Sequence, residues 1–337
     1  MNSLERIVET LNFSRPDRVP VIAQVFGHAA SVAGVPLNEY VRDGQLLARC
    51  QLEALSRYGY DAVFSMMDAS VEAEAAGCEL TYREGQYPAV SRHALAAGGD
   101  WDALEVPDPG SAGRMPEMLK ALQLMRRELD GEVLVVGCVM GPFTLAAQLL
   151  GMEALLFLSV DDPAGLEQLL GYATAVVTRF GREQIAAGAH LPIVFDPASS
   201  PAVIPPDFFR AQVLPFLSRV FGDFKAAGAA ANWLHVAGPA APVLPDFTDA
   251  GVDIANFDYY INADEAARLL PRVCLNGNIK SVAFVEAGAG EIGQKAGALL
   301  EAFDSRGGFM LSSGCEIPPE SRPENVAALV RAARAGS

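Results

Sequence analysis

The sequence predicts an α/β protein built as a (β/α)8 barrel, or TIM barrel, with a short helical extension at its N-terminus. Short apolar runs alternate with helical stretches of about ten or more residues, which is the pattern of repeated β-α units around a parallel sheet. About eight runs can form strands, and they are centred near residues 20, 63, 135, 194, 234, 255, 274 and 310. Eight parallel strands favour closure into a barrel over an open sheet. A length of 337 residues suits one such barrel, so we expect a single domain over residues 1–337.

The first third of the chain contains the extension and an insertion. Residues 2–12 have the apolar spacing of an amphipathic helix, and residues 18–26 are expected to form the first strand. A helix then leads to the second strand, which we expect within 60–68. Residues 78–113 combine short extended pieces with several Gly and Pro residues. We therefore expect an excursion from the barrel there, with His93 on the surface.

From residue 114 the strand-helix rhythm is regular. We expect the remaining strands at 133–140, 192–195, 232–236, 252–257, 273–275 and 308–312. The expected helices occupy 115–129, 144–188, 206–227, 263–270, 289–303 and 323–335. Within 144–188, the residues Asp161-Asp162-Pro163 supply a break and a helix cap.

Composition and charge exclude several classes of function. Apolar residues make up 51% of the chain, which is enough for a large buried core. The formal net charge of −16 repels phosphate backbones and anionic lipid, so we expect neither nucleic-acid binding nor a membrane role. No uncharged run approaches the roughly 20 residues that span a bilayer, and the N-terminus has no signal-peptide core. Five scattered cysteines suit a reducing compartment, so we expect cytoplasmic localisation.

Polar residues gather where the predicted strands end. In barrel enzymes this end of the sheet carries the chemistry, while the opposite end contributes mostly stability. The strand-end polar residues are Asp68, Asp196, His235, Asp258, Asn276, Asn278, Cys315 and Glu316. We expect the reaction centre between His235 and Cys315, the two soft titratable residues of this set. His28 follows the first strand, where a site position and a structural role are equally compatible with the sequence.

Six segments spread over nearly the whole chain carry a family resemblance. They are Arg15-Pro-Asp-Arg-Val-Pro20, Val71-Glu-Ala-Glu-Ala-Ala-Gly77, Met140-Gly-Pro-Phe-Thr-Leu-Ala-Ala-Gln-Leu-Leu150, Leu234-His-Val-Ala-Gly238, Asn276-Gly-Asn278 and Ser313-Gly-Cys-Glu-Ile-Pro-Pro319. In this order they resemble the uroporphyrinogen decarboxylase (URO-D) superfamily. Within it they are similar to the corrinoid-dependent methyltransferases, which include the methylcobalamin:coenzyme M methyltransferases.

The resemblance implies a (β/α)8 barrel and, in the coenzyme M enzymes, a zinc ion held by His-x-Cys and a distant Cys. There the zinc lowers the pKa of the acceptor thiol, and the thiolate attacks the methyl group on cobalt. His235 matches the histidine and Cys315 the distant cysteine, but Ala237 stands where the middle cysteine belongs. Two protein ligands are one fewer than a catalytic zinc site normally has. Unless Asp196 or Glu316 completes the site, we expect weak or substoichiometric zinc.

This departure favours methyl transfer with a partner other than a thiol. The implied reaction moves a methyl group between a small organic substrate, such as an ether, an amine or a pterin, and the cobalt of a corrinoid. None of the four histidines has Asp two positions earlier, so the chain lacks an Asp-x-His-x-x-Gly cobalamin motif, and a separate corrinoid-binding protein must carry the cofactor. The catalytic candidates are His235, Asp68 and Asp196. The candidate substrate contacts are Phe26, His28, Glu72, Asn276, Asn278 and Glu316.

Two alternatives remain. A decarboxylase of the uroporphyrinogen type needs arginines in an N-terminal loop to clamp its substrate's carboxylates, and residues 21–30 contain none, although Asp68 falls close to the position of that enzyme's central acid. A non-catalytic binding or accessory barrel is the second alternative, and the strand-end acids with His235 and Cys315 argue against it. A homodimer is compatible with the sequence.

Overall fold

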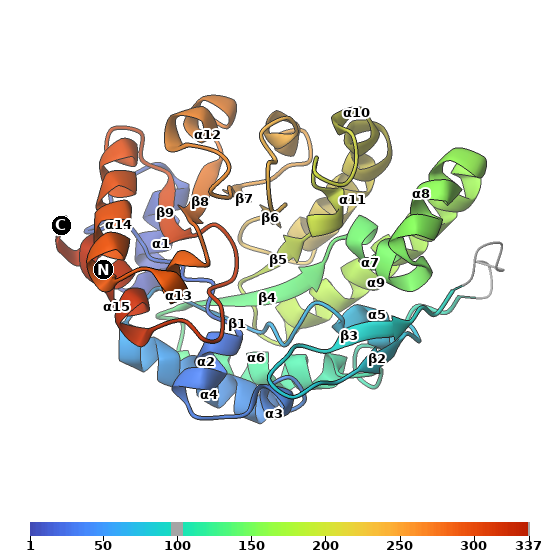
Figure 1. Ribbon diagram of the computed structural model, residues 1–337, viewed down its shortest axis with the longest axis horizontal. Helices are drawn as coiled ribbons and strands as arrows, with labels where there is room; N and C mark the ends of the chain where they lie inside the picture. Colours follow the sequence, from blue (N-terminus) through green and yellow to red (C-terminus); the bar gives the residue numbers. More distant parts are fainter. Residues whose placement is uncertain (96–103, 336–337) are drawn as a thin grey trace.

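The computed structural model describes residues 1–95 and 104–335, and its centre is a parallel sheet that curls into a barrel (Figure 1). Within these ranges the sheet has seven hydrogen-bonded strands in the order β1-β4-β5-β6-β7-β8-β9. They are β1 (Ala62–Phe64), β4 (Leu134–Met140), β5 (Leu191–Phe195), β6 (Trp233–His235), β7 (Ile254–Asn256), β8 (Cys274–Ile279) and β9 (Phe309–Ser313). Every neighbouring pair is parallel, which confirms the predicted TIM-barrel class.

Residues 20–25 close the barrel between β9 and β1. The amide of Ile22 donates to the carbonyl of Leu311 at 2.9 Å, and on the other side the amide of Asp61 donates to the carbonyl of Val21 at 2.8 Å. Val21 and Leu311 form a parallel bridge without a continuous ladder. The first predicted strand is therefore present as an irregular extended segment, residues 20–25, which we call the first stave of the barrel.

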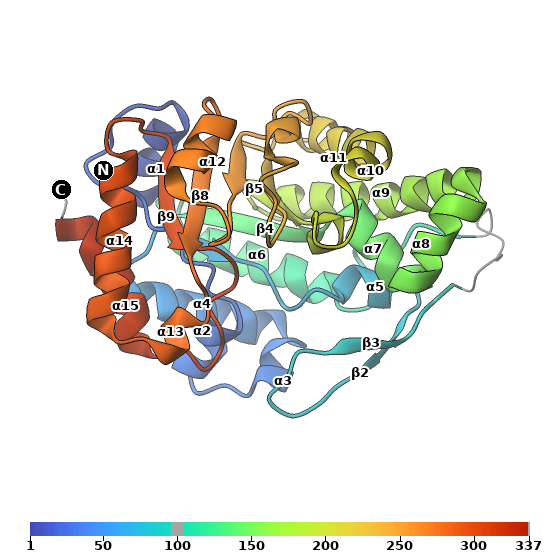
Figure 2. The same ribbon diagram turned by 45° about the horizontal axis from the view of Figure 1, so that its top comes forward.

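Helices surround the barrel (Figures 1 and 2). They are α1 (Ser3–Leu11), α2 (Gly27–Val32), α3 (Leu37–Tyr40), α4 (Gly44–Tyr58), α5 (Val71–Ala75), α6 (Met115–Leu129), α7 (Pro142–Leu150), α8 (Met152–Asp161), α9 (Pro163–Ala186), α10 (Pro206–Phe208), α11 (Leu214–Ala226), α12 (Ala263–Leu269), α13 (Ala283–Glu286), α14 (Ala289–Phe303) and α15 (Pro323–Ala335), with the short turns η2 (Pro197–Ser199), η3 (Phe209–Val213) and η4 (Leu244–Phe247). On α9, buried Leu166, Leu169, Leu170 and Ala173 repeat at helical spacing, which explains why this stretch packs as a helix.

Two predicted helices depart from a regular α-helix where the sequence contains Gly or Pro. The helix expected over 144–188 also breaks at Gly151, whose φ of 93° favours glycine, and α7 and α8 meet there at 104°. The predicted break at Asp162 is confirmed, because its side chain accepts the Gly165 amide at 3.0 Å. In the helix expected over 206–227, η3 is a π-helical turn before α11. Pro215 lacks the amide that a regular α-helix requires there, which accounts for this turn.

The excursion after β1 contains a small antiparallel hairpin outside the barrel, made of β2 (Glu79–Thr81) and β3 (Ala89–Arg92) (Figure 1). His93 is exposed, as expected, and one ring nitrogen contacts the carbonyl of Gln148 at 2.7 Å. The stretch 96–103 of the predicted excursion lies outside the described residues. The hairpin loop reaches the barrel through Tyr87, whose hydroxyl accepts the amide of Gly27 at 2.8 Å.

No single helix in the described ranges is long and apolar enough to cross a membrane. The bent pair α7 and α8 passes that test together, by length and composition only.

Candidate functional site

Most of the predicted site residues lie at the carboxyl end of the barrel, the end at which the strands finish. Parallel strands all point the same way, so residues at their ends form one rim. The rim residues are Asp68 after β1, Asp196 after β5, His235 at the end of β6, Asp258 after β7, Asn276 and Asn278 in β8, and Cys315 and Glu316 after β9.

His235 is packed against an aromatic wall and is 2% exposed. Its ring centroid lies 5.2 Å from that of Phe195, which lies 5.9 Å from that of Phe26, which in turn lies 5.2 Å from that of Phe64. Burial lowers the pKa of His235 to about 4, because the imidazolium would lose its hydration. At neutral pH this histidine is therefore an uncharged hydrogen-bonding group that can take up a proton during a reaction.

Asp196 is fully buried and only half satisfied. Its Oδ1 accepts the amide and the hydroxyl of Thr144 at 2.8 and 2.6 Å, at the N-terminus of α7. Its Oδ2 is buried and has no hydrogen-bond partner. Burial raises the pKa of Asp196 to about 6. A Cβ at Gly141 would lie 2.4 Å from Oδ2, so this close approach requires glycine.

Asp68 is held by an arginine that the sequence analysis missed. Arg114, immediately before α6, contacts both carboxylate oxygens of Asp68, and its Nε donates to Glu74 at 2.6 Å. The amide of Ser70 also donates to Asp68, at 2.8 Å. The charge of Asp68 is thus compensated within the protein. No motif marks Arg114, which is 46 positions from its partner in the chain.

Glu72 is buried, Glu316 is half-buried, and each carboxyl group has few partners. The amide of Met140 donates to Glu72 at 2.8 Å, and burial raises the pKa of Glu72 to about 7. Glu316 accepts the hydroxyl of Tyr87 and, at 3.3 Å, the amide of Gly27, and burial raises its pKa to about 7 as well. Both groups are therefore partly protonated near neutral pH.

His28 and Asn278 make contacts within the fold. One ring nitrogen of His28 lies 2.9 Å from the hydroxyl of Tyr58 and the other lies 3.2 Å from the carbonyl of Pro319. The side-chain amide of Asn278 donates to the carbonyl of Ile261 at 2.6 Å. These bonds favour a structural role for His28, one of the two roles compatible with the sequence.

The residues near His235 and Cys315 do not fit a zinc ion. Among the described residues, no group of three His, Cys, Asp or Glu side chains is arranged to hold a metal. Ala237 contributes no ligand, so two candidates remain without a third.

A polar layer inside the barrel, next to His235, was not anticipated from the sequence. Gln24 Nε2 lies 3.0 Å from Asn256 Oδ1 and 3.4 Å from His235 Nδ1. Trp233 Nε1 donates to the same Asn256 oxygen at 3.2 Å. The available signal was weak: each amide is a single polar residue within an apolar run. Asn276 is paired with Asn256 in the register of β7 and β8, so both side chains are on the same face of the sheet.

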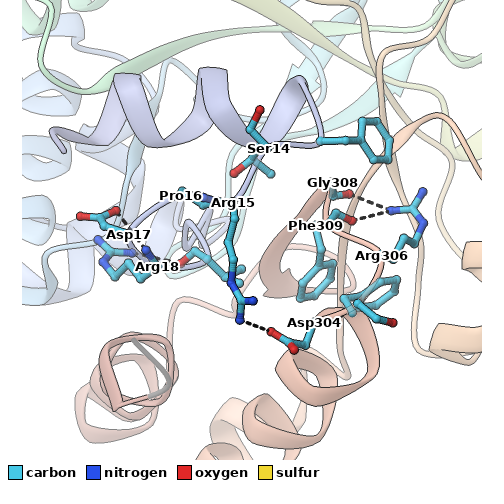
Figure 3. Close-up of a pocket in the computed structure, with 15 residues that line it drawn as sticks. Ser14, Arg15, Pro16, Asp17, Arg18, Asp304, Arg306, Gly308 and Phe309 are labelled. Carbon is cyan, nitrogen blue, oxygen red and sulfur yellow. Dashed lines mark hydrogen bonds and ion pairs between the residues drawn. The ribbon is translucent and has the colours of Figure 1, made fainter.

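A cavity of about 460 Å³ lies at the opposite, amino end of the barrel (Figure 3). It is formed where the chain enters the first stave and β9. Its cationic side chains are already engaged: Arg15 pairs with Asp304 at 2.7 Å, and Arg306 donates to backbone carbonyls, among them that of Gly308 at 2.9 Å. The carboxyl end therefore remains the candidate site.

The fold and the site are those of a TIM-barrel enzyme with buried acids and a histidine at the carboxyl end of the sheet. The family model described as "Uroporphyrinogen decarboxylase (URO-D)" matches residues 2–336. The chain belongs to the uroporphyrinogen decarboxylase family.

Relatives within this family divide between two activities. A uroporphyrinogen decarboxylase of Thioalkalivibrio sulfidiphilus is 31% identical over 332 residues, covering 88% of this chain and 90% of the relative. A methylcobamide:CoM methyltransferase of Methanosarcina barkeri is 27% identical over 335 residues, covering 97% and 96%. A solved structure, "methyltransferase from Methanosarcina mazei", superposes with a TM-score of 0.91 at 27% identity and covers 100% of this chain and 99% of that one. A B12-independent methionine synthase from Shewanella, at 14% identity and a TM-score of 0.63, shares the fold.

Proposed function

We propose that this protein is a corrinoid-dependent methyltransferase that moves a methyl group between a small organic substrate and the cobalt of a corrinoid held by a separate protein. The observation that carries this proposal is the state of the charges at the carboxyl end. Among the described residues, Arg114 is the arginine in contact with the rim acids, and Asp68 and Glu74 engage it. A site without a free guanidinium is poorly suited to a substrate with many carboxylates.

The similarity to the Methanosarcina methyltransferases supports the same choice. It extends over 97% of the chain in sequence and 100% in structure. The identities to decarboxylases and to methyltransferases are similarly low, so the argument against decarboxylation rests on Asp68. A carboxylate bound by Arg114 and Ser70 has little capacity left for a substrate.

Each rim residue then has a role that follows from its surroundings. His235, uncharged at neutral pH, exchanges a proton with the substrate atom that gains or loses the methyl group. Asp196, with an unpartnered Oδ2 and a pKa raised to about 6, is the second proton carrier. Asp68 and Arg114 hold the loop after β1 in place. The corrinoid would supply the methyl-carrying cobalt, and this chain would bind, orient and protonate or deprotonate the small substrate.

The partners follow from the same proposal. A corrinoid-binding protein would dock over the carboxyl end, because the reacting atoms must approach to about 3–3.5 Å. The widely scattered cysteines favour a cytoplasmic enzyme. Zinc is not part of the proposal, because the residues present do not fit it.

Free cobalamin tests this function without the partner protein. The protein is mixed with methylcobalamin and a panel of acceptors, and with reduced cobalamin and a panel of methyl ethers and methylamines, while the corrinoid absorbance is followed. We expect protein-dependent exchange of the methyl group with at least one compound. Release of carbon dioxide from uroporphyrinogen by the same preparation, without any exchange at cobalt, would overturn the proposal.

A further inference from the structure

The polar layer of Gln24, Trp233, His235 and Asn256 has only one consistent hydrogen-bond orientation. The indole nitrogen of Trp233 can only donate, so the atom of Asn256 that faces it at 3.2 Å must be the oxygen. That oxygen also receives Gln24 Nε2 at 3.0 Å, which fixes the Gln24 amide. The same nitrogen faces His235 Nδ1 at 3.4 Å, so Nδ1 is the acceptor and the proton of the neutral ring is on Nε2.

This orientation leaves several buried atoms without partners. Gln24 Oε1, Asn256 Nδ2 and Asn276 Oδ1 make no hydrogen bond within the described structure. Their side chains are at most 1% exposed. They come from the first stave, β7 and β8, and His235 joins them from β6 with its Nε2–H. With Asn276 added to the layer, Gln24 and Asn276 present two acceptors and Asn256 and His235 present two donors, and none of these four side chains is charged.

We propose that this layer binds an uncharged carboxamide or lactam group of the small substrate. The N–H of a carboxamide can donate to the side-chain oxygen of Gln24 or Asn276. Its carbonyl oxygen can accept from Asn256 Nδ2 or His235 Nε2, and both groups belong to one planar unit. A carboxylate or ammonium group would be buried there without a counter-charge in the layer, which is costly. The inference rests on the proposed function for the reaction, and it adds the class of substrate.

The effect of a substitution on stability distinguishes a ligand-binding layer from a layer that only stabilises the fold. A buried polar atom without a partner costs about 1–3 kcal/mol, and an apolar residue of the same shape avoids that cost. Asn276→Leu removes the unpartnered acceptor together with one bond, from Asn276 Nδ2 to the carbonyl of Met310 at 3.3 Å, so the melting temperature should change little. Loss of binding without loss of stability is expected of a ligand contact and not of a structural bond.

Thermal shift measurements with three simple probes test the inference. The probes are 2-pyrrolidinone as the lactam, acetate as the anion and methylammonium as the cation. For the wild-type protein we expect the saturating lactam to raise Tm by roughly 2 °C or more, with no shift from the two ions. Asn276→Leu should abolish this shift, and Gln24→Met should do the same if Asn276→Leu fails to fold.

Asn232→Leu is the matched control. Asn232 is also buried, also donates once to a carbonyl, that of Gly251 at 2.8 Å, and also has an unpartnered Oδ1, but it lies just before β6 at the amino end. Its lactam shift should equal that of the wild type. A lactam shift that survives both Asn276→Leu and Gln24→Met, or no shift in the wild type, would overturn the inference.

The methyl-transfer assay separates this inference from the proposed function. Methyl transfer by a protein that ignores the lactam would overturn only the substrate class. Lactam binding that depends on Asn276, in a protein that exchanges no methyl group with cobalamin, would support the binding layer and overturn the methyltransferase.

Discussion

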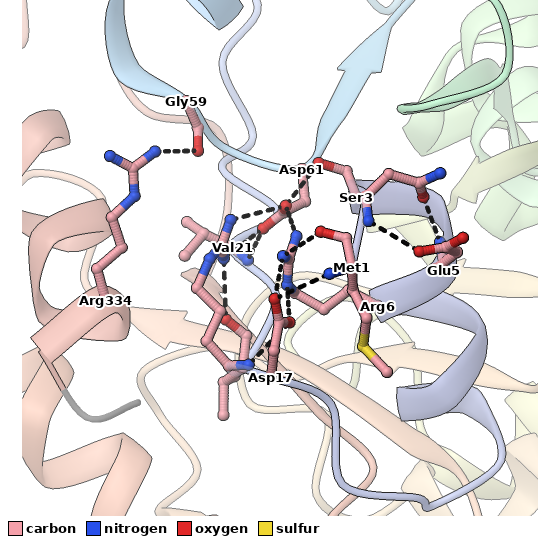
Figure 4. A network of polar contacts seen from close by, with 12 residues as sticks. Met1, Ser3, Glu5, Arg6, Asp17, Val21, Gly59, Asp61 and Arg334 are labelled. Carbon is pink, nitrogen blue, oxygen red and sulfur yellow. Dashed lines mark hydrogen bonds and ion pairs between the residues drawn. The ribbon is translucent and has the colours of Figure 1, made fainter.

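Each end of the barrel buries an aspartate, Asp61 at the amino end and Asp196 at the carboxyl end, and the two carboxyl groups differ in how many hydrogen bonds they receive. At the amino end, fully buried Asp61 receives bonds from Arg6 at 2.8 Å, Arg18 at 2.7 Å, the Ser3 hydroxyl at 2.7 Å and the Val21 amide at 2.7 Å (Figure 4). At the carboxyl end, fully buried Asp196 satisfies one oxygen and leaves the other without a partner. Both carboxyl groups are equally removed from water, so the difference lies in their partners.

The comparison teaches where this protein gains stability and where it gives stability up. A buried acid surrounded by donors fastens α1 and the first stave to the barrel. Buried polar atoms without hydrogen-bond partners lower the stability of the folded state. Natural proteins tolerate that loss mainly at functional sites. Substitutions of the same kind at the two ends should therefore affect different properties.

The largest effect is expected at His235. His235→Ala should reduce methyl-transfer turnover by about 10²–10⁴-fold, because a positioned proton carrier is lost. His190→Ala is the matched control at the amino end: burial also lowers the pKa of His190 to about 4, but its ring accepts the Val135 amide at 2.9 Å. It should reduce stability and leave turnover of the folded protein unchanged. Equal losses of turnover in both variants would break the comparison.

Asp61→Ala should have the largest effect on stability. Removal of this carboxylate leaves Arg18 nearly buried without its ion-pair partner and leaves Arg6 with Asp17 alone, and breaking a buried ion pair costs about 3–5 kcal/mol. Urea denaturation measures the loss. A cost below about 1 kcal/mol would mean that the amino-end network does not stabilise the fold.

The pH dependence of stability should have opposite signs at the two ends. The pKa of Asp196 rises from 3.8 to about 6 on folding, so its contribution is present below about pH 4 and is lost as the pH rises through 6. Arg6 holds the pKa of Asp17 well below its usual value, so that contribution is present above pH 4 and is lost as the pH falls. Asp196→Asn should remove a decline of roughly 1–3 kcal/mol between pH 4 and 7. Parallel stability curves for the wild type and this variant would contradict the pKa of Asp196.

The smallest effect concerns zinc at the carboxyl end. The unmodified protein should bind zinc weakly, and Ala237→Cys should raise occupancy toward one ion per chain, because it supplies the missing thiolate beside His235 and Cys315. Elemental analysis after dialysis measures the change. Tight one-to-one zinc in the unmodified protein would show that another side chain completes the site.

Much of the fold was predictable because each barrel strand is a local apolar run that ends in polar residues. The positions of β4 to β9 follow from such runs, and so does the placement of Asp196 and His235 at the rim. The break at Gly151 was missed because a glycine inside a helical pattern is usually tolerated.

The site contacts were less predictable, because they join distant parts of the chain. Tyr87 and Glu316 are 229 positions apart, and Gln24 and Asn256 are 232 apart. No local pattern indicates that Gln24, Trp233 and Asn256 face one another across the barrel. Closure of the sheet brings them together, and that closure is visible only in three dimensions.

One measurement tests the central claim most directly. The protein is incubated side by side with methylcobalamin labelled in its methyl group plus the acceptor panel, and with uroporphyrinogen labelled in its acetate carboxyl groups. We predict that the methyl label moves from methylcobalamin to an organic acceptor only when the protein is present, and that no labelled carbon dioxide is released. Labelled carbon dioxide without movement of the methyl label would contradict the methyltransferase assignment and return the protein to the decarboxylase side of its family.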